Sequence, residues 1–288
     1  MIRLGKPAKE LDVSEITKAV RRMCISANYN VPDGSIQALK KALETEESGV
    51  GREVLARILE NHRIAREECL AACQDTGVAM VFVEAGQDVR FVGGELYDAI
   101  NEGVRQGYRD GYLRNSVVTD PLFERVNTGD NTPAFIYVDI VPGRDVKITV
   151  AAKGGGAENM SGLRMLTPAA GVEGIKQFVV EQVANAGPNP CPPVVVGVGI
   201  GGTFDRVAVL AKKALLRSVG SHNPHPMYAK LEAELLEEIN KLGIGPQGFG
   251  GRTTALGVNI EFAPCHIASL PVAVNLNCHV GPHESVIL

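Results

Sequence analysis

Six cysteines are the residues of this 288-residue sequence with the most distinctive chemistry. They lie far apart along the chain, at Cys24, Cys69, Cys73, Cys191, Cys265 and Cys278. The first residues, MIRLGKPAKELDVSE, lack the apolar segment of a secretory signal, so a disulfide framework is not expected. Metal binding, catalysis and simple burial are the roles that remain for these thiols.

The closest pair of thiols lies in EECLAACQDTG, at residues 67–77. Cys69 is in phase with the apolar stripe of the preceding helical pattern, which includes Leu55 and Ile58, so we predict that Cys69 is buried. Cys73 stands where that pattern ends, and QDTG then supplies an amide, a carboxylate and a hydroxyl. Cys73 is therefore the better candidate for a working thiol. The four-residue spacing leaves a thiol-redox protein as a remote alternative, because it places both thiols on one face if the helix continues.

The other four cysteines are isolated, which argues against a zinc ribbon. Cys24 falls on the apolar face of a predicted helix and is expected to be buried. Cys191 lies in NPCPP, where prolines restrict the backbone, and Cys265 and Cys278 each follow an apolar strand pattern. Thiols at the ends of strands and helices can converge on one iron–sulfur cluster, because its ligands need not be close in sequence. The pattern alone does not choose between Cys265 and Cys278.

Two glycine-rich segments suggest anion binding by backbone N–H groups. The first has the G-x-G-x-x-G spacing of a dinucleotide site, with Gly197, Gly199 and Gly202 between a strand and a helix. The strand that should end in an acidic residue about 20 positions later is replaced by RSVGSHNPHPMY, so a nucleotide-binding protein is only a remote alternative. The second segment, KGGGAENMSG, favours close approach of a small anion over a plain turn, with Lys153 as its counter-charge.

The elements that must position these residues form an α+β pattern. Helical periodicity predicts a helical lobe at about 10–73, followed by a buried strand at 77–86. The segment AFIYVDIVPGRDVKITVAAK predicts two strands joined by a tight turn, and a further helix is predicted near 171–186. We expect a single domain over 1–288, in which the helical lobe packs with mixed β-sheets and surrounding helices.

Composition excludes several classes of function. Hydrophobic residues make up 45% and charged residues 22%, with a net charge of −4, so the chain lacks the basic character of a nucleic-acid-binding protein. No apolar run reaches the roughly 18–20 residues that cross a bilayer. We expect a soluble cytoplasmic protein with no nucleic-acid or membrane partner.

Six motifs occur together in an order that is typical of one enzyme family. They are CQDTG, LRNSVV, NTGDNTPA, KGGGAENMS, CPPVVVGVGIGGTFD and HIASLPVAVNLNCH. From about residue 10 to residue 285 the chain resembles the α subunit of two-subunit, class I iron–sulfur-dependent hydro-lyases, namely fumarate hydratase and L(+)-tartrate dehydratase. The resemblance implies a [4Fe–4S] cluster held by three cysteines, with one iron left open. The matching positions are Cys73, Cys191 and Cys278, whereas Cys265 falls outside the match.

The resemblance also implies a small dicarboxylate substrate and residues that bind it. The matching positions are Gln74, Asp75, Arg114 and, in the glycine loop, Gly156. Asp75 is the candidate catalytic base on this chain, with a carboxylate that caps a turn as its alternative role. Among the histidines, His266 is expected to lie nearest the site as a supporting residue.

The activity implied first is that of fumarate hydratase, which interconverts fumarate and L-malate in the tricarboxylic acid cycle by Lewis-acid elimination or addition of water. The alternative is the α subunit of L(+)-tartrate dehydratase, which converts tartrate to oxaloacetate. Single-chain members of the family that it resembles carry a further C-terminal domain, and we expect this domain to be absent from the present chain. The resemblance therefore implies a separate β subunit, without which the chain is inactive, in an α2β2 heterotetramer or with a homodimer of α.

Overall fold

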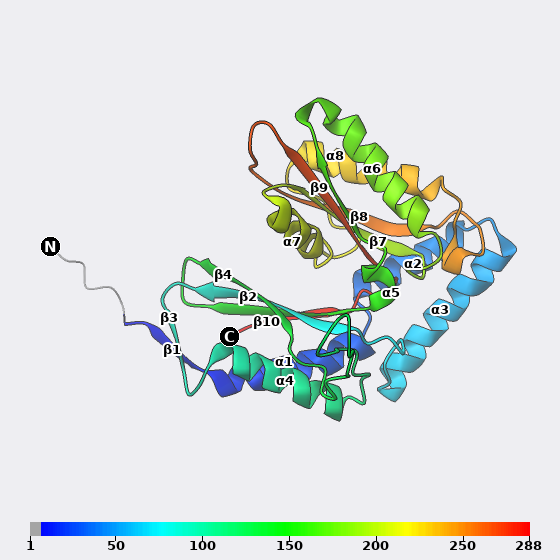
Figure 1. Ribbon diagram of the computed structural model, residues 1–288. Helices are drawn as coiled ribbons and strands as arrows, with labels where there is room; N and C mark the ends of the chain where they lie inside the picture. The colour runs from blue at the N-terminus through cyan, green and yellow to red at the C-terminus, as the bar shows by residue number, and fades with distance from the viewer. Residues whose placement is uncertain (1–6) are drawn as a thin grey trace. The chain divides into compact units, whose positions relative to one another are not determined.

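A computed structural model describes residues 7–288 of the chain (Figure 1). The chain divides into two compact units, each made of segments that are distant in sequence. The first unit consists of Met1–Asn30, Glu68–Lys153 and Pro282–Leu288, and the second consists of Val31–Glu67 and Gly154–Gly281. Each unit combines a four-stranded sheet with helices, which confirms the predicted α+β class. The single domain expected over 1–288 stays a prediction.

The first unit is built on a sheet with the strand order β10-β5-β2-β4. Its strands are β2 (Val78–Gly86), β4 (Phe135–Val141), β5 (Val146–Lys153) and β10 (His283–Ile287). A small second sheet pairs β1 (Lys9–Asp12) in parallel with β3 (Val89–Val92). Strand β2 pairs antiparallel with β5 and parallel with β4. The nearly continuous apolar sequence of β2 explains its central position, because a strand covered on both faces needs apolar residues throughout.

The two strands expected on either side of PGRD form, but they do not pair with each other. Strands β4 and β5 flank the turn as predicted, but β2 lies between them, and both pair with β2 rather than with each other. The alternation of β4 is that of a half-exposed edge strand, with Ile140 75% exposed, whereas β5 is mostly buried. The predicted strands and the turn between them are therefore confirmed, but a local turn signal does not reveal that a third strand fills the centre of the sheet.

Two helices of the first unit pack closely against each other. They are α1 (Val13–Tyr29) and α4 (Leu96–Asp110), and α1 also contacts the sheet (Figure 1). Helix α1 begins after Asp12, whose side chain accepts a backbone N–H bond of 2.8 Å in the first turn. Gly107 of α4 permits the close approach, because a Cβ there would lie 2.7 Å from Cβ of Cys24. Cys24 is 1% exposed, as predicted, and burial raises the pKa of its thiol to about 12.

The second unit contains a sheet with the strand order β6-β9-β7-β8. Its strands are β6 (Gly162–Leu166), β7 (Val194–Gly201), β8 (Ala255–Ala263) and β9 (Leu270–Asn277). Its helices are α2 (Asp33–Thr45), α3 (Gly49–Glu68), α5 (Gly155–Glu158), α6 (Gly171–Ala186), α7 (Phe204–Ala214) and α8 (Pro226–Asn240), with 3₁₀ turns η1 (Pro168–Ala170) and η2 (Pro246–Gly248). Helices α6 and α8 share a core with one face of β7 and β9, and α7 packs on the other face.

The N-terminal helices form where periodicity predicts them, but they are divided between the units. Helix α1 belongs to the first unit, whereas α2 and α3 belong to the second. There, Leu39 of α2 and Leu55 of α3 share a core with Val195 of β7. Periodicity identifies the apolar face of a helix, but it does not identify the surface that covers this face.

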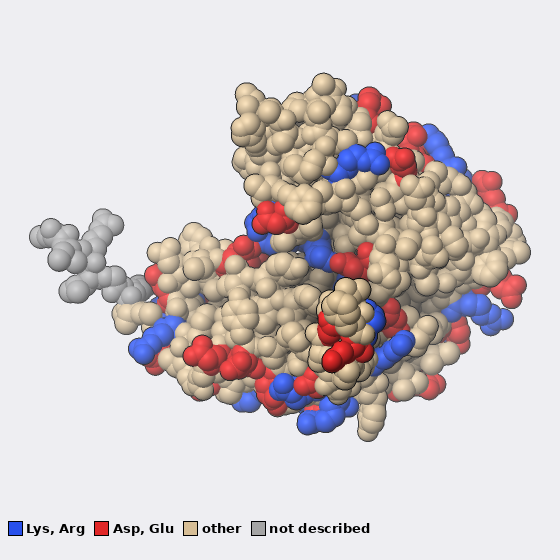
Figure 2. All heavy atoms as spheres, in the orientation of Figure 1, with Lys and Arg blue, Asp and Glu red and all other residues tan. Residues whose placement is uncertain are grey.

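The exterior of the molecule carries charges of both signs. On the face drawn in Figure 2, the described Lys and Arg side chains are interspersed with Asp and Glu, in keeping with the net charge of −4. Within residues 7–288, no helix combines the length and the apolar character that crossing a bilayer requires.

Candidate active site

The helix before the CQDTG motif ends earlier than predicted. Helix α3 ends at Glu68, ahead of Cys69 and Cys73. Cys69 is exposed with a φ of +53°, so the prediction that it is buried is wrong. A residue in the left-handed region stops the helix, and the two thiols therefore do not share a helix face. None of the six cysteines, all of which lie among the described residues, forms a disulfide.

Cys73 begins a turn that its neighbours hold together within the first unit. Its Sγ accepts the N–H of Asp75 at 3.4 Å, and Oδ1 of Asp75 accepts the N–H of Gly77 at 3.1 Å. Gly77 has a φ of +66°, and a Cβ there would lie 2.4 Å from the carbonyl carbon of Lys153, so only glycine fits. Cys73 is half-buried, and Gln74 is exposed. Oδ1 of Asp75 therefore caps the turn, and the catalytic role of this carboxylate stays a prediction.

Arg114 is fixed beside this turn through its backbone. Its N–H donates to Oγ1 of Thr76 at 2.9 Å, and Thr76 Oγ1 donates to its carbonyl at 3.3 Å. The hydroxyl of Tyr108 donates to the Thr76 carbonyl at 2.8 Å, and Nδ2 of Asn131 donates to the Gly77 carbonyl at 3.1 Å. The first unit thus brings an exposed arginine next to the CQDTG turn, as the predicted substrate contacts require.

The NTGDNTPA motif supplies supporting residues that sequence reasoning did not assign. Asn131 is fully buried with a φ of +59°. Asp130 accepts hydrogen bonds from Nε of Arg105 at 2.8 Å and from the N–H and Oγ1 of Thr132 at 3.0 and 2.7 Å. Burial by itself would raise the pKa of Asp130, but the bonds from Thr132 and Arg105 outweigh burial and lower the pKa to about 2.

Replacing this carboxylate, as Asp130→Asn, is expected to remove part of the acid sensitivity of folding. A carboxyl whose pKa falls from 3.8 to about 2 stabilises the fold above about pH 4, and this contribution is lost as the pH falls from about 4 towards 2. The Asp130 side chain is 28% exposed, and solvent screens its ion pair with Arg105. We therefore expect Asp130→Asn to lower the free energy of unfolding at neutral pH by about 1 kcal/mol. Urea unfolding of wild type and variant at about pH 7 and about pH 3 measures the difference. A difference that does not shrink at the lower pH would contradict this explanation.

In the second unit, two of the three predicted cluster ligands lie at the same end of the sheet. Cys191 precedes β7 and Cys278 follows β9, and these strands run antiparallel with Val195 opposite Asn277. Cys265 precedes β9 and lies at the opposite end, roughly 27 Å away along the eight residues of this strand. The register therefore separates Cys265 from Cys278, which the sequence pattern could not do.

The glycine loop approaches the same end of the sheet. A Cβ on Gly156 would lie 3.3 Å from the carbonyl oxygen of Asn189, in the turn that leads to Cys191. The N–H of Cys191 donates to the carbonyl of Pro188 at 3.0 Å, and the residue is exposed with a φ of +55°. Lys153, the predicted counter-charge of the loop, is 1% exposed at the end of β5 in the first unit. The second unit thus gathers two predicted ligands and one predicted substrate contact.

A buried histidine follows Cys278. Nδ1 of His279 lies 3.1 Å from Nε2 of His62, which comes from α3. Burial lowers the pKa of His62 to about 4, and burial together with the neighbouring His62 lowers that of His279 to about 3, so both rings are neutral at pH 7. Sequence reasoning missed His62, because its position fits an ordinary helix stripe. His266 is exposed on the loop with Cys265, where its Nδ1 accepts the N–H of Ala268 at 3.1 Å.

The G-x-G-x-x-G spacing has a packing explanation. Gly197 and Gly199 lie on the face of β7 that meets α7, where a Cβ would lie 2.3 Å from the carbonyl oxygen of Ala211 and 2.2 Å from that of Val207, respectively. After α7 the chain continues into α8 rather than into a strand that ends in an acidic residue. These glycines allow close contact between helix and strand, so the spacing does not indicate a dinucleotide site.

Gly199→Ala is expected to destabilise the fold by about 2–3 kcal/mol, because the added methyl group has to push α7 away from β7. At this chain length the change corresponds to a fall in Tm of roughly 5–10 °C, measurable by calorimetry. Gly49→Ala is the control, because no atom lies within 4 Å of a Cβ at that position in α3. Equal Tm values for the two variants would show that α7 moves away from β7 without loss of stability.

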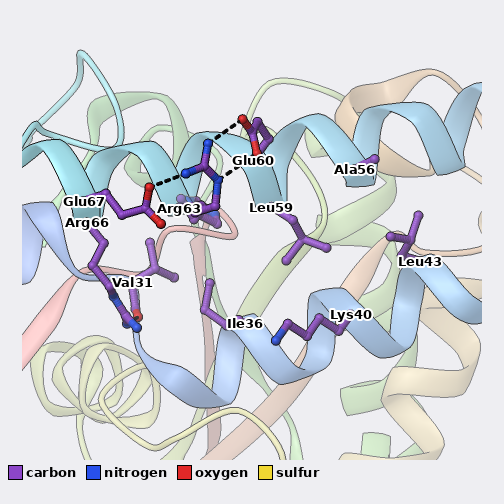
Figure 3. Close-up of a pocket in the computed structure, with 11 residues that line it drawn as sticks. Val31, Ile36, Lys40, Leu43, Ala56, Leu59, Glu60, Arg63, Arg66 and Glu67 are labelled. Atoms are coloured by element: carbon purple, nitrogen blue, oxygen red, sulfur yellow. Dashed lines mark hydrogen bonds and ion pairs between the residues drawn. The ribbon is translucent and has the colours of Figure 1, made fainter.

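A cavity of about 520 Å³ lies between α2 and α3 in the second unit (Figure 3). It has an apolar wall and a charged rim, formed by Val31, Ile36, Leu43, Ala56 and Leu59 and by Lys40, Glu60, Arg63, Arg66 and Glu67. Arg63 on the rim is engaged by both Glu60 and Glu67. His62 also lines this cavity, so the residue lies between the cavity and His279.

A family comparison accounts for these motifs together. The family model for fumarate hydratase (Fumerase) matches residues 17–286. The chain belongs to the fumarate hydratase family. It is 44% identical over 269 residues to the putative L(+)-tartrate dehydratase subunit alpha of Methanocaldococcus jannaschii, covering 92% of this chain and 94% of that protein. It is 37% identical over 279 residues to L(+)-tartrate dehydratase subunit alpha of Escherichia coli strain UTI89, covering 96% of this chain and 91% of that protein.

Membership of the fumarate hydratase family confirms the resemblance found in the sequence. The chain is a hydro-lyase of the class I, iron–sulfur-dependent type, and its relatives over nearly the full length are alpha subunits. Within the described part of either unit, no three His, Cys, Asp or Glu side chains gather closely enough to hold a metal ion. The identity of the cluster ligands and of the substrate contacts therefore stays a prediction.

Proposed function

We propose that this chain is the α subunit of a two-subunit hydro-lyase that dehydrates L(+)-tartrate to oxaloacetate. The observation that carries this choice is the name of the relatives, L(+)-tartrate dehydratase subunit alpha, which match over 91% or more of both chains. The expectation of fumarate hydratase activity becomes the second candidate, and the description of the family favours it. L(+)-tartrate and L-malate, the hydroxylated substrates of the two enzymes, are both four-carbon dicarboxylates with a hydroxyl next to a carboxylate.

The proposed cofactor is a [4Fe–4S] cluster held by Cys73 of the first unit with Cys191 and Cys278 of the second. The thiols fit this role because all three are at least partly exposed in segments between helices and strands, whereas Cys24 is buried with a pKa raised to about 12. The sheet register supports Cys278 over Cys265 as the partner of Cys191. When bound, such a cluster supplies an iron without a protein ligand, which acts as a Lewis acid on the substrate hydroxyl and carboxylate.

The remaining proposed site residues bind the substrate and move its proton. Arg114 presents an exposed guanidinium from a backbone fixed at Thr76, which suits a charge-assisted bond to a carboxylate. Gln74 contributes an exposed side-chain amide, and Gly156 offers close backbone approach. We assign the role of base to Asp75, whose carboxylate the Gly77 N–H orients at 3.1 Å.

The proposed partner is a separate β subunit, in an α2β2 heterotetramer or with a homodimer of α. The names of the relatives as alpha subunits support a second kind of chain. The proposed location is the cytoplasm, because six thiols without a disulfide fit a reducing compartment.

The decisive experiment is an anaerobic assay of the α chain, alone and co-expressed with the β chain, on L(+)-tartrate, L-malate and a methylated malate. We expect no turnover by α alone. We expect the complex to have a kcat/KM for L(+)-tartrate at least about tenfold above that for L-malate, which corresponds to about 1.4 kcal/mol of discrimination. A complex that prefers L-malate by the same margin would favour fumarate hydratase, and turnover by α alone would overturn the two-subunit proposal.

A further inference from the structure

His62 and His279 form an isolated pair of buried imidazoles in the second unit. Nε2 of His62 lies 3.1 Å from Nδ1 of His279, and the ring centroids are 5.1 Å apart. His62 is 4% exposed and His279 is 9% exposed. Two segments that are far apart in sequence, α3 and the chain after β9, are therefore joined by one hydrogen bond between ring nitrogens.

Two neutral imidazoles can make this bond in two ways, because one nitrogen must carry the proton and the other must accept it. In the first arrangement His62 donates from Nε2, so His62 Nδ1 is bare and His279 carries its own proton on Nε2. In the second, His279 donates from Nδ1, so His62 must carry a proton on Nδ1. The tautomer of each ring thus determines that of the other.

The surroundings of His62 favour the first arrangement. Its Nδ1 is buried and has no hydrogen-bond partner among the described residues. A buried N–H without an acceptor is rarer and costlier than an acceptor that lacks a donor. The proton of His62 is therefore expected on Nε2, where His279 accepts it, and the proton of His279 on its own Nε2.

We propose that His62 is a positioning residue that fixes His279 as an Nε2–H donor and anchors the chain directly after Cys278. The register of β7 and β9 puts this anchor at the sheet end where Cys191 also lies. Replacing a residue that contacts a metal ligand and fixes its orientation typically lowers metal affinity by about 10–100-fold. The link to iron rests on the proposed function, whereas the tautomer of the pair does not.

The tautomer is tested by ¹⁵N NMR of the full-length chain labelled at its six histidines. Protonated and bare ring nitrogens have well-separated ¹⁵N shifts, and the His62→Gln and His279→Gln variants assign the two rings. We expect both rings to be neutral at pH 7 with their protons on Nε2. A proton on Nδ1 of His279, or rapid exchange between the two forms, would overturn the assignment.

The positioning role is tested with a pair of variants at one site. His62→Gln retains an N–H donor close to the position of Nε2, whereas His62→Leu removes it, and His222→Gln at an exposed histidine is the control. We expect the His279 signal of His62→Leu to show both tautomers, while His62→Gln keeps the single form. An unchanged His279 signal in His62→Leu would overturn the role of His62, and His62→Gln still tests it should the leucine variant fail to fold.

The link to the cluster is tested by chelator challenge of anaerobically reconstituted α chain. We expect iron loss from His62→Leu to be about tenfold faster than from wild type or His222→Gln, with His62→Gln close to wild type. Equal rates of iron loss would mean that His62 sets only the tautomer of His279, and they would overturn its role in positioning the ligand. A wild-type chain that takes up no iron would instead contradict the proposed cofactor, and the NMR result would still stand.

Discussion

Cys278→Ser is expected to abolish stable iron binding, whereas Cys265→Ser is expected to leave it unchanged. The thiolate is the cluster ligand, and a serine hydroxyl does not replace it at neutral pH. Loss of the Lewis acid should lower the activity of the α–β complex by at least about a thousandfold, equivalent to about 4 kcal/mol of transition-state stabilisation. Iron per chain and visible absorbance after anaerobic purification measure the first effect, and turnover measures the second.

The two variants form a matched pair, because each removes one Sγ atom from a loop that flanks β9. Cys265 is exposed, and its thiol donates to the carbonyl of Ser269 at 3.3 Å, so its loss should cost little stability. Thermal unfolding of both variants controls for misfolding. Retained iron in Cys278→Ser with loss in Cys265→Ser would show that the opposite end of the sheet holds the cluster, and the assignment of Cys191 would then fail with it.

The sequence predicted most elements of the fold, and the errors share a physical cause. Periodicity located α1, α6 and β2, because each depends on one apolar face or apolar run that the local sequence determines. The pairing of the strands on either side of PGRD, and the division of α1, α2 and α3 between the two units, depend on distant segments and could not be predicted from local patterns. Cys69 shows the same limit on a smaller scale, since its apolar phase is correct but its φ of +53° ends the helix first.

The candidate site was likewise predicted only in part, because motifs identify residues but not their spatial neighbours. Motifs identified Cys73, Asp75 and Arg114, and the structure brings these residues together in the first unit through Thr76. Residue types alone could not separate Cys265 from Cys278, because both follow apolar strand patterns. The antiparallel register of β7 and β9 separates them by the length of a strand. His62 carried no signal at all, because a buried histidine in a helix stripe looks like any other core residue until its partner is known.

Glu46→Ala is expected to destabilise the second unit by about 3–5 kcal/mol, with a fall in Tm of roughly 10 °C. Glu46 is 4% exposed after α2, and its carboxylate accepts the N–H groups of Glu47, Ser48, Arg252 and Thr253 at 2.8–3.1 Å. Burial by itself would raise the pKa of Glu46, but the N–H groups of Arg252 and the other donors outweigh burial and lower it. Alanine would leave four backbone donors without this acceptor.

The position of this carboxylate links stability to the candidate site. Glu46 holds the segment just before β8, and β8 pairs in parallel with β7 so that Ala255 lies opposite Val194, three residues after Cys191.

Glu46→Gln keeps one acceptor oxygen and should lower the free energy of unfolding by about 1–2 kcal/mol. Because the folded pKa is lowered, the carboxylate stabilises the fold above its ordinary pKa of 4.5 and less so as the pH falls below it, so this acid sensitivity should be absent in Glu46→Gln. Glu47→Ala is the control, since that side chain is 81% exposed and its ion pair with Arg252 should contribute at most about 0.5 kcal/mol. Equal free energies of unfolding for Glu46→Ala and Glu47→Ala in urea would mean that other contacts hold the segment before β8.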